Sequence, residues 1–232
     1  MNLVQRLTAS VRGQGWSATA AKLRTMFVDR WFDFRYGVDT CACSELDELT
    51  IDSANKTSGY LYKPVRILPL RKFFQAIRPT LPREAVLVDF GSGKARVLLV
   101  SAEFGFQAAR GVEFARELCA VSRINCTRYQ ARSGTATRLT TVEADAAKYQ
   151  IRPEENFFIM CNPFDDSIVR AVLDNIAASA TRHPRDIWIA YYNPKWGAVI
   201  EQQPRFAAER EFDFWGHRFV LYANRAQRHG QA

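Results

Sequence analysis

Residues 85–100 read AVLVDFGSGKARVLLV, and this stretch combines three structural signals. Ala85 to Val88 is an apolar run of strand length, and the residues after Gly93 repeat with helical periodicity. Between them stand Gly91 and Gly93, which can adopt positive φ and let a ligand approach the backbone. The first N–H groups of the following helix are directed at the same place. The stretch predicts a strand, a tight ligand-binding turn and a helix.

Two classes of ligand use such a turn, namely dinucleotides and S-adenosylmethionine. The dinucleotide pattern requires a third glycine where this chain has Arg96. Asp89 also disfavours a pyrophosphate, because two unit charges ~4 Å apart repel by about 4 kcal/mol at an effective dielectric of ~20. The same carboxylate suits a ligand that carries an ammonium and a sulfonium. The pattern Asp89-x-Gly91-x-Gly93 resembles the first motif of class I S-adenosylmethionine-dependent methyltransferases. The alternative is a structural corner with incidental glycines.

The sequence from Ala85 onward alternates between strand-length apolar runs and helical patterns, which is typical of a doubly wound parallel sheet. The expected strands cover residues 85–88, 107–113, 139–144, 157–161 and 187–192. The expected helices cover residues 68–77, 94–104 and 115–129, and Leu118, Val121 and Ile124 form the expected inner face of the last one. A fourth expected helix follows Asp165, Asp166 and Ser167, any of which can cap its N-terminus. Two final runs, 206–214 and 219–222, predict an antiparallel hairpin at the sheet edge. The expected fold class is therefore α/β, with a doubly wound, mainly parallel seven-stranded sheet, a C-terminal antiparallel hairpin and an N-terminal helical extension.

The chain divides into three expected regions. Residues 1–58 form a helical and irregular extension, residues 59–223 form the methyltransferase-like domain, and residues 224–232 form a polar tail that we expect to be disordered. Residues 1–36 carry six basic and two acidic side chains, a net charge of +4, with apolar residues at helical spacing. Such a helix can lie on a membrane surface, or it can pack on the core or on a partner.

Composition limits the function classes further. The 232 residues are 47% hydrophobic, which is enough for one α/β domain with an extension. No apolar run reaches 18 residues and no signal peptide is evident, so we expect neither a transmembrane helix nor secretion. The five cysteines form no C-x-x-C pair, which favours reduced thiols in the cytoplasm, and the three histidines form no cluster, so we expect no metal. The net charge of +8 permits an acidic partner, but the basic residues are scattered.

Polar or special residues stand at or just after the ends of four of the expected strands: Asp89, Glu113, Asp145 and Asn162. In open α/β sheets, ligands bind beyond the carboxyl ends of the strands. Glu113 lies 24 residues after Asp89, and a carboxylate there can accept two hydrogen bonds from vicinal ribose hydroxyls. The alternative for each carboxylate alone is a solvated strand end or a helix cap. Together the four residues predict a ligand site at one edge of the sheet.

The family resemblance extends over about residues 60–222 and implies a set of cofactor contacts. Asp145-Ala146 occupies the position of an acidic-small pair near the adenine amine. Tyr62-x-Pro64 resembles the Tyr-x-Pro-Thr element of Dot1-like and related lysine methyltransferases, with Val65 in place of Thr. The residues that would bind S-adenosylmethionine are Tyr62, Asp89, Gly91, Ser92, Gly93, Arg96, Glu113, Asp145 and Ala146.

Asn162-Pro163-Phe164 is the candidate catalytic element. It resembles the Asn-Pro-Pro-aromatic motif of methyltransferases that act on nitrogen, shortened by one proline. An asparagine oxygen can accept a hydrogen bond from an amine, and an aromatic ring can hold a cation with about 0.5–2 kcal/mol. The alternatives are an Asn-capped turn with a packed Phe164, or Cys161 in the first position. Tyr191 and Tyr192 could line the acceptor pocket, or serve as core and surface aromatics.

These observations predict an S-adenosylmethionine-dependent methyltransferase. Methyl transfer from a sulfonium needs alignment and exclusion of water rather than a catalytic triad, so no general base is nominated. The Dot1-like resemblance implies that the methyl acceptor is a protein or another amine. A small molecule is nearly as well supported as the acceptor, and a nucleic acid is less favoured. An RNA or DNA methyltransferase and a catalytically inactive interaction module stay as alternatives. Asp89→Ala and Glu113→Ala should each weaken cofactor binding by ~1.5–3 kcal/mol without unfolding the domain.

Overall fold

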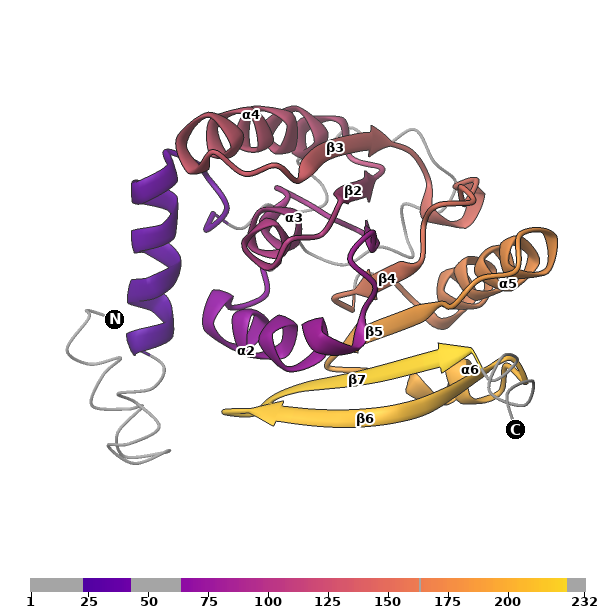
Figure 1. Cartoon of the computed structure of the whole chain (residues 1–232). Helices are drawn as coiled ribbons and strands as arrows, with labels where there is room; N and C mark the ends of the chain where they lie inside the picture. The colour runs from indigo at the N-terminus through magenta and orange to yellow at the C-terminus, as the bar shows by residue number, and fades with distance from the viewer. Residues whose placement is uncertain (1–22, 43–63, 163, 225–232) are drawn as a thin grey trace.

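The computed structural model describes residues 23–42, 64–162 and 164–224, and Figure 1 shows the path of the chain. A helix at residues 23–36 comes first and is coloured indigo. The later elements, in chain order, are α2 (Ile67–Ile77), η3 (Arg78–Thr80), β1 (Val86–Phe90), α3 (Arg96–Ser101), η4 (Ala102–Phe104), β2 (Ala108–Glu113), α4 (Arg116–Ser133), β3 (Arg138–Glu143), η5 (Ala146–Lys148), β4 (Phe157–Met160), α5 (Asp166–Arg182), β5 (Trp188–Tyr192), α6 (Gly197–Glu201), β6 (Phe206–Phe214) and β7 (His217–Asn224).

The strands form one seven-stranded sheet in the order β3-β2-β1-β4-β5-β7-β6. β1 pairs in parallel with β2 on one side and with β4 on the other, so the strand order reverses between β1 and β4. β7 pairs antiparallel with both β5 and β6. This arrangement confirms the predicted fold class, including the C-terminal antiparallel hairpin and the N-terminal helix. It also creates the switch point at which open α/β sheets bind ligands.

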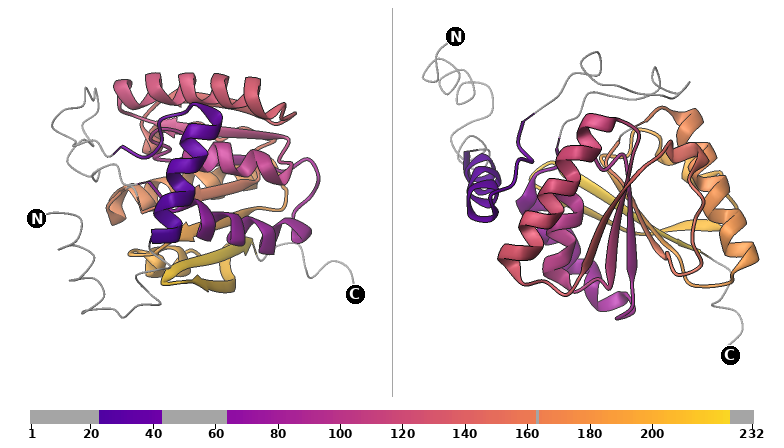
Figure 2. Two further views of the ribbon diagram at one scale, coloured as in Figure 1. Left: turned by 90° about the vertical axis from the view of Figure 1, so that its left-hand side faces the viewer. Right: turned by 90° about the horizontal axis from the view of Figure 1, so that it is seen from above.

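Helices cover both faces of the sheet, which has one apolar core on each side (Figure 2). Leu87 of β1 packs into the core under α2, α3 and α4, while its neighbour Val88 packs into the core under α5 and α6. Successive side chains of a strand point to opposite faces, so a strand buried on both faces must be apolar throughout. This requirement explains the continuous apolar run at the start of β1.

The helix at residues 23–36 is attached to the layer formed by α2, α3 and α4. Phe32 is buried and stacks on Tyr129 of α4, with ring centroids 5.8 Å apart. Asp29 is also buried and accepts hydrogen bonds from the Arg66 guanidinium at 2.8 Å and from the Ile67 amide at 3.0 Å. The helix therefore shares the core of the α/β domain. The expected domain boundary between residues 58 and 59 lies outside the described residues.

The inner face of α4 differs from the prediction. Ile124 is 50% exposed, whereas Ser122 and Asn125 are buried. The hydroxyl groups of Ser122 and Thr141 form a hydrogen bond of 2.5 Å, so polar side chains fill part of the inner face that the prediction gave to apolar ones. The prediction for Ile124 was therefore wrong, because the helix buries hydrogen-bonded polar groups instead.

The end of the hairpin also differs. Asn224, expected in the polar tail, belongs to β7: its Oδ1 accepts from the Ile187 amide at 3.2 Å, and its Nδ2 donates to the Arg185 carbonyl at 2.8 Å. The rest of the expected tail, residues 225–232, lies outside the described residues. Among the helices that the structure describes, none has the length and apolar character needed to cross a bilayer.

Candidate ligand-binding site at the carboxyl edge of the sheet

The parallel register brings the predicted strand-end residues to one edge of the sheet. Asp89 of β1 lies opposite Gly111 of β2 and Ile159 of β4. Glu113 and Asn162 stand at or just after the carboxyl ends of β2 and β4, beside the switch point. Asp145 follows β3, the next strand outward. The topology therefore places the four strand-end residues at the edge where this class of sheet binds ligands.

The glycine turn between β1 and α3 adopts left-handed backbone conformations. Gly91 has φ 73°, Gly93 has φ 52° and Ala95 has φ 73°. Glycine adopts such angles without the steric cost that a Cβ brings. The amides of Gly91 and Ser92 both donate to the Val112 carbonyl, at 2.9 and 3.2 Å, which fixes the turn against β2. The strand–turn–helix prediction for this stretch is confirmed.

Gly111 lets the turn approach the sheet closely, and sequence reasoning did not single it out. A Cβ built on Gly111 would lie 2.4 Å from Ser92 Oγ and 2.7 Å from Ser92 Cβ. Any larger residue would therefore push the turn away from β2. A glycine inside an otherwise apolar strand is the signal that could have found this contact.

Asp89 carries the most informative polar group of the site. Its side chain is 1% exposed, and within the described structure neither Asp89 Oδ1 nor Ser92 Oγ has a hydrogen-bond partner. Burial raises the pKa of Asp89 well above its usual range, and the nearby Glu113 carboxylate raises it further. Buried polar atoms are nearly always hydrogen-bonded in folded proteins, because leaving them unpaired costs free energy. A buried acceptor without a donor therefore indicates a place for a donating ligand.

Glu113 binds the backbone of the site itself. Its Oε2 accepts from the Gly93 amide at 2.9 Å, and its Oε1 accepts from the amides of Phe114 and Ala115 at 3.0 Å each. Burial raises the pKa of Glu113, while these three hydrogen bonds act in the opposite direction. The carboxylate thus joins the glycine turn to the start of α4. Because a carboxylate oxygen can accept two hydrogen bonds, Oε2 retains one acceptor position.

Arg96 contacts the N-terminal segment. Its guanidinium donates to Thr40 Oγ1 at 2.9 Å, to the Val65 carbonyl at 3.0 Å and to Cys41 Sγ at 3.1 Å. It also lies 3.3 Å from Asp29 Oδ2, and its side chain is 2% exposed. Arg96 therefore anchors residues 29–41 to the start of α3. Its assignment as a cofactor contact stays a prediction.

The other three predicted cofactor contacts are Asp145, Ala146 and Tyr62. Asp145 caps η5, since its Oδ1 accepts from the Ala147 amide at 2.9 Å. Ala146 is buried in the core under α5. Tyr62 lies outside the described residues. The proposed roles of all three toward a cofactor stay predictions.

The Asn162-Pro163-Phe164 element is only partly described, because Pro163 lies outside the described residues. Asn162 has φ 57°, and its Oδ1 accepts a hydrogen bond of 3.3 Å from the Tyr191 hydroxyl. Phe164 is 6% exposed and packs into the core beside α5. The preceding Cys161 lies near Asp89, and burial raises the pKa of its thiol well above the usual range. Asn162 is thus oriented by a neighbour, while the ring of Phe164 packs inward.

A second polar pair lies at the end of β5, and one of its members was missed from the sequence. The Tyr192 hydroxyl and His217 Nδ1 are 2.5 Å apart, and their rings stack with centroids 5.8 Å apart. Burial raises the pKa of Tyr192 to about 12. Burial lowers the pKa of His217, and the nearby Arg66 charge lowers it further. The antiparallel register, in which Tyr192 pairs with Phe219, brings His217 to this place. That register could not be read from the isolated histidine.

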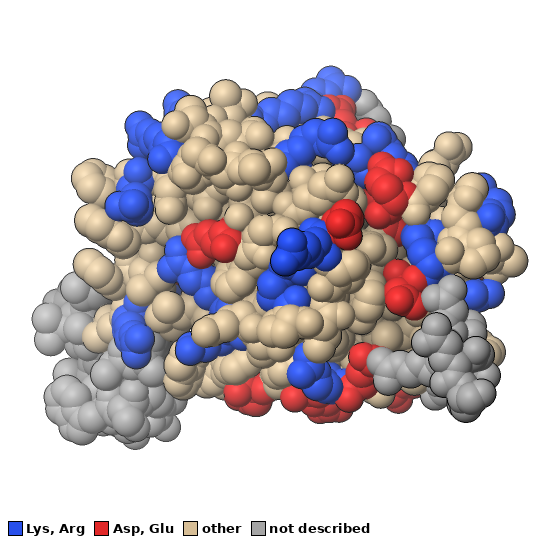
Figure 3. Space-filling model, in the orientation of Figure 1, with Lys and Arg blue, Asp and Glu red and all other residues tan. Residues whose placement is uncertain are grey.

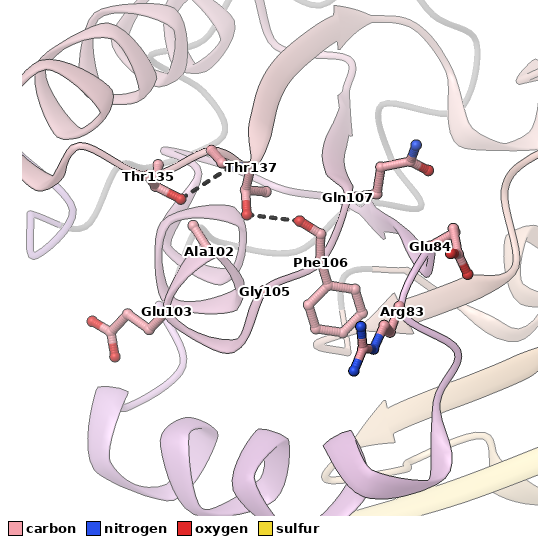
Figure 4. A pocket seen from close by; sticks show the side chains of 10 residues that line it. Arg83, Glu84, Ala102, Glu103, Gly105, Phe106, Gln107, Thr135 and Thr137 are labelled. Carbon is pink, nitrogen blue, oxygen red and sulfur yellow. Dashed lines mark hydrogen bonds between the residues drawn. The ribbon is translucent and has the colours of Figure 1, made fainter.

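A hollow of about 520 Å³ lies at the opposite end of the sheet (Figure 4). Its lining includes Glu84, Gln107 and Thr137, which precede β1, β2 and β3 respectively. These positions are at the amino ends of the strands, away from Asp89 and Glu113. The hollow is therefore separate from the candidate site. Over the described ranges, no group of three or more His, Cys, Asp or Glu side chains could hold a metal ion.

Neither a protein-family model nor a curated protein sequence matches this chain. Solved structures do resemble it. Magnesium protoporphyrin IX methyltransferase (ChlM) from Synechocystis PCC 6803, with bound SAM, has a TM-score of 0.51 at 10% identity over 68% of this chain and 79% of that chain. An RNA methyltransferase from Salinibacter ruber, in complex with S-adenosyl-L-homocysteine, has a TM-score of 0.51 at 16% identity over 70% of this chain and 94% of that chain. TrmN from Thermus thermophilus has a TM-score of 0.52 at 14% identity over 69% of this chain and 49% of that chain.

These similarities identify the fold. The chain has the Rossmann-like α/β fold of the class I S-adenosylmethionine-dependent methyltransferases, with its seven-stranded sheet and terminal antiparallel hairpin.

Proposed function

We propose that this protein is an S-adenosylmethionine-dependent methyltransferase. The observation that carries the proposal is the buried carboxylate of Asp89, whose Oδ1 has no partner within the described structure, next to a turn with two glycines at positive φ. The similarity of the whole fold to methyltransferases supports the same assignment.

The hydrogen-bond acceptors of the site suit this cofactor chemically. A buried carboxylate is stabilised by a cation that also donates hydrogen bonds, and S-adenosylmethionine carries an ammonium and a sulfonium. Asp89 Oδ1 would accept from the ammonium, and the free acceptor position of Glu113 Oε2 would accept from a ribose hydroxyl. When bound, the cofactor supplies an already activated methyl group. The protein must then align the acceptor and exclude water.

For the acceptor, we favour an amine nitrogen of a protein or a small molecule. The Asn162 side-chain oxygen is held by the Tyr191 hydroxyl, so it is positioned rather than free to rotate. It can accept a hydrogen bond from an N–H and orient the nitrogen lone pair. The neutral pair of Tyr192 and His217 stands at the end of the adjacent strand. Because burial lowers its pKa, the His217 ring is neutral at pH 7 and can accept a proton there.

Methylation of RNA is the second candidate. The net charge of +8 favours it, as does the similarity to the Salinibacter ruber RNA methyltransferase, of which this chain covers 94%. The face shown in Figure 3, however, has Lys and Arg interspersed with Asp and Glu. An RNA substrate would bind with strong salt dependence, whereas a small amine would not.

Calorimetric titration with S-adenosylmethionine, S-adenosylhomocysteine and NAD tests the proposal. We expect micromolar binding of the first two and none of NAD. Asp89→Asn should weaken binding at least about tenfold, since a hydrogen bond to a charged group contributes about 1.5–3 kcal/mol. Asp186→Asn, at an exposed acid before β5, is the matched control and should bind normally. Absence of binding, or equal affinity in the Asp89 variant, would contradict the assignment. Formation of S-adenosylhomocysteine with amine or RNA acceptors then separates the two candidates.

A further inference from the structure

The helix at residues 23–36 exposes a continuous apolar stripe. Leu23, Phe27, Trp31 and Phe34 are 43%, 68%, 51% and 77% exposed. Their spacing of four, four and three residues places them on one side of a helix. An isolated exposed apolar residue needs no explanation, but three aromatic rings in one stripe do.

Arginines flank this stripe on both sides. At about 100° per residue, Arg30 falls on one side of the stripe, and Arg24 and Arg35 fall on the other. All three are exposed. The outer surface of the helix is therefore apolar along its middle and cationic along both margins.

The two acidic residues of the helix are directed inward. Asp29 is 2% exposed and binds Arg66 and the Ile67 amide. Asp33 accepts from the Thr40 hydroxyl at 2.6 Å and from the Cys41 amide at 2.9 Å. Their charges are thus engaged within the protein. The outer face is left with a positive charge that complements an anionic surface.

The inner face of the helix is already packed, so the apolar stripe is not the face that holds it to the domain. Phe32 stacks on Tyr129, on the side opposite the stripe. The view in the right-hand panel of Figure 2 places this helix outside the helical layer that covers the sheet. The stripe is therefore presented by a fixed helix.

We propose that this face binds the surface of an anionic lipid bilayer, with the helix lying parallel to it. An apolar stripe with cationic margins is the pattern of helices that rest at the membrane interface. Phe27, Trp31 and Phe34 would enter the boundary between headgroups and acyl chains, while the arginines pair with lipid phosphates.

Vesicle flotation of the full chain tests this proposal. The probes are phosphatidylcholine vesicles with about 30% phosphatidylglycerol, and vesicles of phosphatidylcholine alone. We expect binding to the anionic vesicles, at least about tenfold weaker binding to the neutral ones, and release at ~1 M salt, where the Debye length falls to about 3 Å. The triple variant Phe27→Ser, Trp31→Ser, Phe34→Ser should lose at least about tenfold in binding. Arg24→Gln with Arg30→Gln and Arg35→Gln should lose the preference for anionic lipid.

The matched control is Trp215→Ser, which removes a tryptophan of similar exposure, 53%, from the turn between β6 and β7. It should bind vesicles like the wild type. Circular dichroism melting must show that the variants remain folded. Three results would overturn the proposal: no binding by the full chain, equal binding to neutral vesicles, or equal loss in the control. Light scattering tests a fourth result. If the full chain binds no vesicles but self-associates, and the triple variant does not self-associate, the stripe would be assigned to a second copy of the chain.

Discussion

Asn125 of α4 forms a two-way hydrogen bond with the backbone of Asp39, 86 residues earlier. Asn125 Oδ1 accepts from the Asp39 amide at 2.9 Å, and Asn125 Nδ2 donates to the Asp39 carbonyl at 2.8 Å. Nδ2 also donates to the Lys94 carbonyl at 3.0 Å, and Lys94 Nζ lies 3.0 Å from Asp39 Oδ2. One amide thus joins the N-terminal segment, the glycine turn and α4.

Asn125→Ala should destabilise the protein by about 1–3 kcal/mol, because it leaves the buried Lys94 carbonyl and the part-buried backbone groups of Asp39 without this partner. Ile124→Ala, at the adjacent exposed position, is the control and should change stability by less than ~0.5 kcal/mol. Urea denaturation of both variants measures the difference. Equal effects would show that the amide contributes no more than a surface side chain.

The junction at Asn125 shows what the sequence could not reveal. Hydrophobic periodicity describes one helix at a time, so it assigned the inner face of α4 to apolar residues such as Ile124. The polar partners of that face come from Asp39 and Thr141, which are remote in sequence. By contrast, the cap of α5 is local and was predicted correctly: Asp165 Oδ1 accepts from the amides of Ser167 and Ile168.

The candidate site likewise has features that could be predicted from the sequence and features that could not. The positions of Asp89 and Glu113 at one edge could be predicted, because parallel strands end together at a switch point. The backbone partners of Glu113 and the contact of His217 with Tyr192 could not, since they depend on the exact turn and on the hairpin register. Long-range side-chain contacts leave no periodic signal in the sequence.

Arg96 and Arg66 both bind Asp29 but should differ in importance. Arg96→Met should cost about 3–5 kcal/mol, because it breaks a buried ion pair and three further hydrogen bonds. Arg66→Met should cost about 1 kcal/mol, because the Arg66 side chain is 35% exposed. Denaturant titrations give both values, with exposed Arg83→Met as the neutral reference. A larger loss in the Arg66 variant would reverse this ranking.

Glu113→Ala should destabilise the fold as well as the ligand site. Three backbone amides would lose their acceptor, and one unsatisfied buried donor already costs ~1–3 kcal/mol. This expectation differs from the one based on sequence alone, in which the variant remained stably folded. Glu113→Gln keeps one carbonyl oxygen and should cost less than Glu113→Ala. Thermal melting without ligand checks the order, and unchanged melting in the alanine variant would contradict the assigned hydrogen bonds.

His217 should make stability fall in mild acid. Burial and Arg66 lower its pKa in the folded protein below the usual value of 6.5, so the unfolded chain takes up a proton first as the pH falls. The stabilisation is complete above about pH 6.5 and is lost as the pH falls through the lowered pKa. His217→Asn cannot titrate and should lose less stability between about pH 7.5 and pH 5. His183→Asn, at an exposed histidine, should retain the wild-type dependence.

Asp89 should make the stability of the ligand-free protein fall as the pH rises, which is the opposite of the effect of His217. Burial and Glu113 raise its pKa, so between the unfolded and folded pKa values the folded state holds a proton that the unfolded state has released. Its stabilising contribution is complete below about pH 4 and is lost as the pH rises through the raised pKa. The Asp89→Asn variant lacks this loss, so its stability relative to the wild type should increase from about pH 5 to pH 8.

The same substitution should weaken cofactor binding, which separates a ligand-binding role from a structural one. An approaching ammonium favours the ionised carboxylate, so wild-type affinity for S-adenosylmethionine should rise with pH while Asp89 releases its proton. In Asp89→Asn, affinity should be at least about tenfold lower and nearly independent of this titration. Urea denaturation and calorimetry over one pH series measure both quantities on the same samples. A variant that loses stability and binding together would indicate that Asp89 supports the fold, whereas gained stability with lost binding is the signature of a charge retained for a ligand.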